Sequence, residues 1–342
     1  MKIAVLGAGS WGTSLARLLA RKGYQVALWT YEPELVEEIK KTSINTWYLD
    51  GFTLPENLEA NNSIPEVLQD AEMVVSVTPS HAIRSVLGQC APHLPKTCPV
   101  VCCSKGIEIG TGKLMSEVLE EVLPDHPRDK FAFLSGPSFA KEVAQEHPTA
   151  VVIAGYDKEL MEKVQETFRT SFFMTFTHHD VLGVEVGGAL KNVMAIATGI
   201  VDGLGYGNNT RAALITRGLY ELIKVGQIYG AEPMTFAGLA GMGDLVLTCT
   251  GGLSRNRQVG IQLGKGKSLK EILESMNMVA EGVKTTKAVY QLAEKHQISA
   301  PICKAIYEIL YEDKAPSLAV QELTALPLSQ EFRALFADPA AQ

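Results

Sequence analysis

The sequence predicts an α/β fold, in which an N-terminal doubly wound parallel sheet is followed by a C-terminal all-helical domain. From residue 1 to about residue 180, short Val- and Ile-rich runs alternate with amphipathic helical patterns, as in sheets buried on both faces. After residue 180 these runs stop, and apolar residues recur at helical spacing, for example in 212–229. Because 342 residues exceed what one core usually supports, we expect two domains, 1–180 and 181–342.

Each expected strand is short and is followed by a helical stretch. The strands are expected at Ile3–Leu6, Gln25–Trp29, Met73–Val77, Val100–Cys103, Phe131–Leu134 and Ala150–Ile153. Ligands of open α/β sheets bind beyond the carboxyl ends of the strands, so the residues that follow each run are candidates for a site. In the helical half, glycines gather between Gly183 and Gly266. Glycine weakens helices, so we expect close backbone packing there or room for a ligand at helix ends.

Composition excludes several classes of function. The chain has 31 Lys and Arg against 38 Asp and Glu, a net charge of −7, without a basic stretch, which argues against a nucleic-acid partner. The longest apolar runs, such as Met73–Val77 and Thr149–Ala154, fall far below the roughly 20 residues of a membrane span, so we expect no integral membrane segment. Six cysteines form no CxxC pair and lack metal-ligand spacing to histidine. We therefore expect buried reduced thiols, no metal site and a cytoplasmic protein.

The first expected strand leads directly into the sequence GAGSWG, with Gly7, Gly9 and Gly12 at fingerprint spacing. Between a strand and a helix, this spacing provides a tight turn, close approach of a pyrophosphate and close helix packing, as in Rossmann-type domains. We therefore expect NAD(H) or NADP(H) as cofactor. After the second strand, Glu32 could hold the ribose hydroxyls, whereas Tyr31 or Thr30 could edge the adenosine instead. No arginine stands there to receive a 2′-phosphate, so the choice between the two cofactors stays open.

Two further strand ends carry candidate residues. Lys105 follows Val100–Cys103 and would place a cation at the crevice. Gly136, Pro137 and Ser138 follow Phe131–Leu134 and are expected to start a helix, whose unpaired N–H groups suit an anion or a hydroxyl.

The helical half contains one conspicuous charge on an apolar helix, Lys191. No residue at helical spacing can pair with it, so its ammonium either reaches water or serves a ligand, as a proton donor and acceptor would. Asp244 lies between glycines and an apolar run. The SRNR segment, Ser254–Arg257, combines a good N-cap with two guanidinium groups, which suits a phosphate site. A solvated basic turn is the alternative.

These segments occur together with TPSH, SKGIE, SGPSFAKE, GALKNVMAIATGIVDG, GMGDLVLTCT and VAEG. From about residue 3 to about residue 325, the sequence resembles the bacterial NAD(P)-dependent sn-glycerol-3-phosphate dehydrogenases. The resemblance implies reduction of dihydroxyacetone phosphate to sn-glycerol 3-phosphate, which supplies glycerophospholipid synthesis. It also implies a cytoplasmic enzyme that is commonly a homodimer.

The resemblance implies roles for individual residues, with Lys191 as the proton acceptor and a substrate contact. The other implied substrate contacts are Lys105, Gly136, Ser138, Asp244, Ser254, Arg255 and Asn256. The implied cofactor contacts are Ser10, Trp11, Lys105, Ala140, Arg255, Val279 and Glu281. Tyr31 stands where many relatives have Arg or His, so the resemblance does not fix the cofactor.

Two alternatives remain. One is a related dehydrogenase of the 6-phosphogluconate or hydroxyacid type, which SRNR and GMGDLVLTCT argue against. The other is a non-catalytic dinucleotide sensor, which the set of Lys105, Lys191 and Asp244 argues against.

Overall fold

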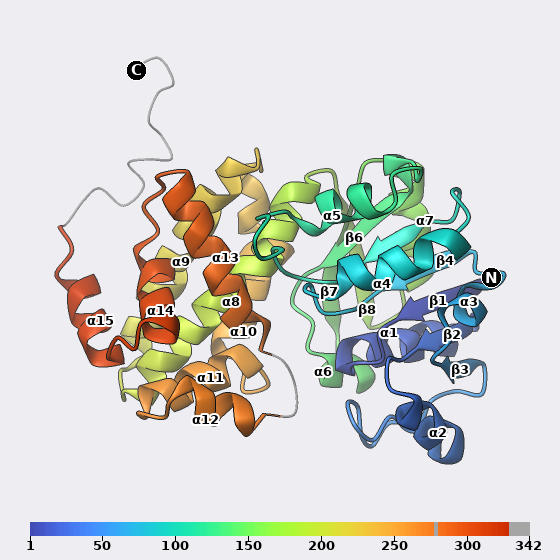
Figure 1. Cartoon of the computed structure of the whole chain (residues 1–342), viewed down its shortest axis with the longest axis horizontal. Coiled ribbons are helices and arrows are strands. Elements are labelled where there is room, and N and C mark those ends of the chain that lie inside the picture. The colour runs from blue at the N-terminus through green and yellow to red at the C-terminus, as the bar shows by residue number, and fades with distance from the viewer. Residues whose placement is uncertain (277–279, 328–342) are drawn as a thin grey trace. The chain divides into compact units, whose positions relative to one another are not determined.

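Eight strands form one sheet in the computed structural model, which describes residues 1–276 and 280–327 (Figure 1). In chain order the strands are β1 (Lys2–Leu6), β2 (Gln25–Trp29), β3 (Leu58–Asn61), β4 (Met73–Ser76), β5 (Val100–Cys102), β6 (Phe131–Ser135), β7 (Thr149–Gly155) and β8 (Phe173–His178). Their spatial order is β3-β2-β1-β4-β5-β6-β7-β8. The first six strands are parallel and follow the order of a doubly wound dinucleotide-binding sheet. The predicted Rossmann-type half is therefore confirmed.

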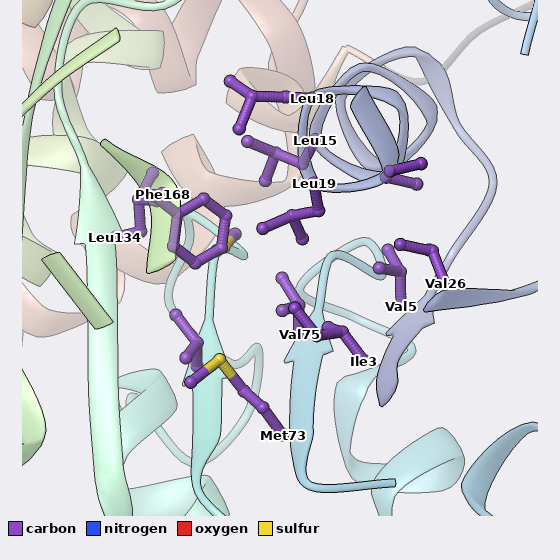
Figure 2. Packing of buried hydrophobic residues seen from close by; sticks show 14 of the residues in the cluster. Ile3, Val5, Leu15, Leu18, Leu19, Val26, Met73, Val75, Leu134 and Phe168 are labelled. Carbon is purple, nitrogen blue, oxygen red and sulfur yellow. The ribbon is translucent and has the colours of Figure 1, made fainter. Parts of the chain in front are cut away.

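Helices cover this sheet within the first of two structural units, Met1–Glu185. They are α1 (Ser10–Arg21), α2 (Pro33–Thr42), α3 (Ile64–Leu68), α4 (Ile83–Cys90), α5 (Met115–Val122), α6 (Ala140–Ala144) and α7 (Lys158–Phe168), with short 3₁₀ turns at Ala91–His93 and Arg128–Lys130. Leu15 and Leu19 of α1 are fully buried and point toward Phe168 at the end of α7 (Figure 2). Their spacing of four places them on one face of α1, and the same face packs on the inner side chains of β1 and β4, such as Val5 and Val75.

The sheet differs from the prediction in two respects. First, β7 pairs antiparallel to β6 and carries β8 parallel to itself, so the sheet is not entirely parallel. A parallel crossover needs a helix that returns the chain along the strand, and the five-residue α6 between β6 and β7 is too short for that return. Second, β3 and β8 were not predicted. Both are edge strands whose residues alternate between buried and exposed, so neither shows a continuous apolar run.

The second unit, Val186–Gln342, contains helices and turns and no strand among its described residues. Its helices are α8 (Val181–Gly203, which begins in the first unit), α9 (Asn208–Ile228), α10 (Asp244–Thr250), α11 (Arg255–Gly264), α12 (Leu269–Glu274), α13 (Glu281–Lys295), α14 (Pro301–Tyr311) and α15 (Pro316–Thr324). A 3₁₀ turn at Pro233–Ala237 and a π-helical turn at Leu239–Gly243 precede α10. The predicted all-helical C-terminal half is confirmed.

Among the described residues, α8 is the one helix long and apolar enough to cross a membrane, and its apolar window is completely buried inside the protein. The glycines of this unit explain part of its packing. A Cβ on Gly199 of α8 would lie 2.1 Å from the Arg257 carbonyl oxygen, and a Cβ on Gly260 of α11 would lie 2.1 Å from the Ile196 carbonyl oxygen. Side chains at these positions are impossible without movement of a helix. Close backbone packing, one of the two expectations for the glycines, holds here.

All six cysteines are free and buried, as expected. Burial raises the pKa of the Cys102 and Cys249 thiols to about 12, so both stay protonated and unreactive at neutral pH.

Candidate functional site

The glycine fingerprint forms the turn between β1 and α1. Gly7 has a φ of +113°, and a Cβ on it would lie 3.0 Å from the Val77 carbonyl oxygen at the end of β4. A Cβ on Gly12 would lie 1.8 Å from the Gly7 carbonyl oxygen, whereas a Cβ on Gly9 would meet no atom within 4 Å. Gly7 and Gly12 therefore close the turn, and Gly9 leaves open space at the N-terminus of α1. This is the cradle that a dinucleotide pyrophosphate needs.

A chain of hydrogen bonds links this turn to the end of β2. The Ser10 hydroxyl donates to the Tyr48 carbonyl oxygen at 2.6 Å, and the Tyr48 hydroxyl donates to Glu32 Oε1 at 3.1 Å. The Thr30 hydroxyl donates to Glu32 Oε2 at 2.8 Å. Burial, and then the Glu32 charge, raise the pKa of Tyr48. The Glu32 carboxylate is thus held in one orientation, while Tyr31 beside it is 78% exposed; sequence reasoning missed Tyr48, which lies in a loop without a pattern.

Several buried polar atoms near the carboxyl edge of the sheet lack a partner among the described residues. They are Trp11 Nε1 in the first turn of α1, Thr78 Oγ1 after β4, and Ser76 Oγ and Ser135 Oγ at the ends of β4 and β6. Buried polar groups are normally hydrogen-bonded. Their position beyond the strand ends, together with the open space at Gly9, fits a dinucleotide cofactor.

The residues after β5 and β6 converge on one carbonyl group. Lys105 Nζ donates to the Gly136 carbonyl oxygen at 3.1 Å, and the Ser138 hydroxyl donates to the same oxygen at 3.0 Å. Gly136 has a φ of +132°, so the chain turns there and α6 begins only at Ala140. The prediction that Gly136–Ser138 starts the helix was wrong for this reason. The Ala140 carbonyl oxygen accepts a hydrogen bond from Ser14 of α1 at 2.9 Å.

In the second unit, Lys191 lies on α8 and is 8% exposed. Its ammonium donates a hydrogen bond to Oδ1 of Asp244, a residue that lies 53 positions further along the chain. Asp244 is 1% exposed, opens α10 directly after the π-helical turn, and also accepts from the Thr248 hydroxyl at 3.3 Å. The interpretation that Lys191 reaches water is therefore wrong.

A buried bridge beside this ion pair joins three helices. Asn256 Nδ2 of α11 donates to Asn192 Oδ1 of α8 at 2.9 Å, and the Gly282 N–H of α13 donates to Asn256 Oδ1 at 2.9 Å. Each residue of the bridge directly follows a predicted site residue in the sequence. Asn192 follows Lys191, Asn256 follows Arg255, and Gly282 follows Glu281. Asn192 and Gly282 were missed, although a second polar residue beside Lys191 on an apolar helix was a usable signal. Val279 lies outside the described residues.

The SRNR segment is only partly the predicted anion site. The Ser254 hydroxyl accepts from the Arg257 N–H at 3.2 Å and caps α11, as predicted. Arg257 itself binds Asp202 of α8, with Nε at 2.9 Å from Oδ2, and Arg211 of α9 binds the other oxygen of Asp202 with Nε at 3.0 Å. One of the two predicted guanidinium groups is therefore committed to an ion pair, and Arg255 is the exposed one.

Two buried carboxyl groups accept hydrogen bonds from N–H groups at the starts of other helices. Glu185 accepts from the Ser116 N–H at 2.9 Å at the start of α5, and burial raises the pKa of Glu185 to about 8. Glu221 accepts from the N–H groups of Ile302 and Cys303 at 2.7 and 3.0 Å at the start of α14, and burial raises the pKa of Glu221 to about 7. Within residues 1–276 and 280–327, no group of three His, Cys, Asp or Glu residues could hold a metal ion.

Comparison with known proteins extends this description. Residues 2–161 match the model of the NAD-dependent glycerol-3-phosphate dehydrogenase N-terminus, and residues 180–321 match that of the C-terminus. A glycerol-3-phosphate dehydrogenase [NAD(P)+] of Geobacter sp. (strain M21) is 54% identical over 330 residues, covering 96% of this chain and 98% of the relative. The same enzyme of Geobacter metallireducens is 55% identical over 322 residues, 94% of this chain and 96% of the relative.

Among solved structures, glycerol-3-phosphate dehydrogenase from Coxiella burnetii superposes with a TM-score of 0.92 at 41% identity, covering 95% of this chain and 99% of that one. The matched residues span both units and include the fingerprint turn and the ion pair between Lys191 and Asp244. The chain therefore belongs to the NAD-dependent glycerol-3-phosphate dehydrogenase family.

Proposed function

We propose that this enzyme interconverts dihydroxyacetone phosphate and sn-glycerol 3-phosphate with NAD(P)H. Residues 1–180 bind the dinucleotide, and residues 181–342 supply the proton and bind the substrate. The observation that carries this proposal is the Lys191–Asp244 pair, a buried ammonium in contact with a buried carboxylate, in a chain that belongs to this family.

The proposed mechanism assigns the proton to Lys191. A bound NAD(P)H supplies the hydride that reduces the substrate carbonyl carbon. Lys191 donates its proton to the carbonyl oxygen in that direction and accepts it in reverse. Asp244 accepts a hydrogen bond from the ammonium and orients it before transfer. The Asn192–Asn256 bridge then fixes the α8 backbone next to Lys191 relative to α11.

The substrate phosphate is assigned to the start of α11. Arg255 is exposed there, and the helix N-terminus adds N–H groups and a favourable dipole. Ser254 and Asn256 flank Arg255 and hold its backbone through their own hydrogen bonds. Lys105, Gly136 and Ser138 are assigned to the substrate as well. Their shared hydrogen bonds to the Gly136 carbonyl keep the Lys105 ammonium in a fixed place.

The cofactor is assigned to the fingerprint turn and its surroundings. The open space at Gly9 and the orphan Trp11 ring N–H support this assignment. The remaining proposed contacts are Gly7, Ser10, Gly12, Tyr31, Lys105, Ala140, Arg255, Val279 and Glu281. We further assign the enzyme to the cytoplasm, as a homodimer whose product enters glycerophospholipid synthesis.

The proposal is tested by following the loss of NADH or NADPH absorbance with dihydroxyacetone phosphate. Lys191→Ala should lower kcat by about 10²–10⁴-fold, the contribution of one general acid, and leave NAD(P)H affinity nearly unchanged. Lys224→Ala is a matched control, because Lys224 lies on α9 and bonds the Ser299 carbonyl oxygen instead. A Lys191→Ala enzyme that retains more than half of the wild-type kcat would show that another group moves the proton.

A further inference from the structure

A cavity of about 340 Å³ lies in the first unit, and none of its lining residues is among those assigned above. It is formed by α1 from Ser14 onward, the end of α6 and the connection from α7 to β8. Four cationic side chains line it: Arg17, Arg21, Lys22 and Arg169. In a chain whose net charge is −7, such a concentration of positive charge around one cavity needs an explanation.

The cations are close enough to disfavour one another. Burial, followed by the charge of Arg21, lowers the pKa of Arg17. Burial also lowers the pKa of Lys22; the charge of Glu166 opposes this shift, and the charge of Arg169 adds to it. Like charges held together in this way cost free energy, and a bound anion would relieve that cost.

Main-chain contacts hold two of these cations in position, since Lys22 Nζ donates to the Glu166 carbonyl oxygen and Arg17 makes two such bonds. Arg17 Nε donates to the Thr53 carbonyl oxygen and its terminal nitrogen donates to the Ala144 carbonyl oxygen, both at 3.0 Å. Two of the five N–H donors of a guanidinium are thereby used, and the fork is oriented before any ligand binds.

The acidic residues nearby only partly offset the four cations. Glu146 lines the cavity and lies 2.9 Å from Arg21, and Glu166 lies 3.9 Å from Arg169. Two carboxylates against four cations leave an excess of two positive charges. The site therefore suits an anion that carries at least two negative charges.

Hydroxyl groups and an apolar floor complete the cavity. Thr170 and Ser171 line it, and Ser171 is exposed. Leu18 and Val143 form a buried floor, 4% and 2% exposed. The volume is at the lower end of the range for small-molecule sites, about 300–1,000 Å³.

The cationic end of the cavity is separate from the fingerprint turn, because Ser10 begins α1 and Arg21 ends it, and eleven residues of helix span roughly 16 Å. The other end of the cavity approaches the residues assigned to the cofactor, since Ser14 lines it and donates to the Ala140 carbonyl oxygen at 2.9 Å.

We propose that this cavity is a second anion site, which binds a small phosphorylated molecule with two or more negative charges. The site lies wholly within the first unit and does not depend on the proposed reaction. Arg17 and Arg21 of α1, with Lys22 and Arg169, bind its phosphoryl oxygens, and the apolar floor receives its carbon part.

Inorganic pyrophosphate is the probe, titrated calorimetrically into the full-length enzyme that is already saturated with NADH. Saturation removes the dinucleotide site as a competitor. Arg21→Gln/Arg169→Gln should weaken pyrophosphate binding by about tenfold or more, since two charged donors are lost. Lys96→Gln/Lys158→Gln removes the same net charge from exposed positions outside the cavity and should change the affinity by less than about twofold. Inorganic phosphate, with less charge, should bind the wild type more weakly than pyrophosphate.

Three outcomes would overturn the proposal. The first is a wild-type enzyme that shows no saturable binding of pyrophosphate. The second is an equal loss of affinity in both double variants, which would reflect net charge alone. The third is a raised KM for NADH in Arg21→Gln/Arg169→Gln, which would assign the cavity to the dinucleotide instead. Circular dichroism of both double variants confirms that they fold.

Discussion

Replacing Asp244 with asparagine tests whether the buried ion pair holds Lys191 in place. The substitution preserves the shape of the side chain and removes its negative charge, while the amide oxygen can still accept from Thr248. The Lys191 side chain is 10% exposed and that of Asp244 is 1% exposed. Water therefore has little access to the ammonium and cannot substitute for the lost carboxylate.

The expected loss follows from this burial. Removing one partner of a buried ion pair costs about 3–5 kcal/mol, whereas an exposed pair contributes about 0–1 kcal/mol. Urea unfolding followed by far-ultraviolet circular dichroism should show a free energy of unfolding that is lower by about 3–5 kcal/mol in Asp244→Asn. Glu162→Gln is the matched control, because it breaks the Lys158–Glu162 pair, whose side chains are 83% and 57% exposed at 3.7 Å.

A second variant separates the unpaired charge from other effects. Lys191→Met/Asp244→Asn removes the ammonium as well, so it should regain much of the stability that Asp244→Asn loses. The reasoning is refuted if Asp244→Asn loses no more stability than Glu162→Gln, or if the double variant is the less stable of the two. The kcat of Asp244→Asn should also fall, since Lys191, the proposed proton donor, loses the group that orients it.

Three further predictions concern other groups. Because burial raises the pKa of Glu185 to about 8 from an ordinary 4.5, the folded chain retains a proton that the unfolded chain releases, and stability falls as pH rises between those values by about 1.4 kcal/mol per pH unit. Urea unfolding at about pH 5.5 and about pH 7.5 should show this fall in the free energy of unfolding for wild type but not for Glu185→Gln. An equal change between the two pH values in both proteins would contradict the prediction. Wild type should use NADH at least as well as NADPH, and Tyr31→Arg, at a position 78% exposed, should shift the kcat/KM ratio toward NADPH by about one to two powers of ten, less at high salt. A wild type that already prefers NADPH a hundredfold would show that other cations read the 2′-phosphate. Asp202→Asn releases Arg211 and Arg257 and should raise KM for dihydroxyacetone phosphate by about tenfold with KM for NADH unchanged; equal KM values in variant and wild type would separate Asp202 from the phosphate site.

Local features, which depend on residues close together in the sequence, were predicted correctly. The fingerprint turn at Gly7–Gly12 and the Ser254 cap of α11 depend on a few consecutive residues, and both form as predicted. The antiparallel β7 was missed because it depends on the length of α6 rather than on the residues of the strand.

Contacts between distant residues could not be predicted. The partner of Lys191 is 53 positions away, and no periodicity along α8 points to it. In the same way, the sequence pattern predicted Arg257 as part of an anion site. Asp202, which binds Arg257, lies 55 positions earlier in the chain, so the pattern around Arg257 could not reveal this ion pair. Sequence reasoning found the charged groups, and tertiary packing decided which of them pair with one another.

The glycine contact between α8 and α11 has a consequence for substrate choice. A Cβ on Gly203 would lie 2.3 Å from the Ile261 carbonyl oxygen, and a Cβ on Gly264 would lie 2.3 Å from the Ile200 carbonyl oxygen. Backbones that touch in this way leave no side chains between them to repack, so the backbone of α8, which carries Lys191, and that of α11, which carries Arg255, are held at a fixed separation. Under the roles proposed for Lys191 and Arg255, this fixed separation sets the distance between the two backbones that hold the carbonyl end and the phosphate end of the substrate. Under the same roles, a homologue that accepts a longer phosphorylated ketone can gain the extra length from a different crossing or from a different reach of the side chain at position 255.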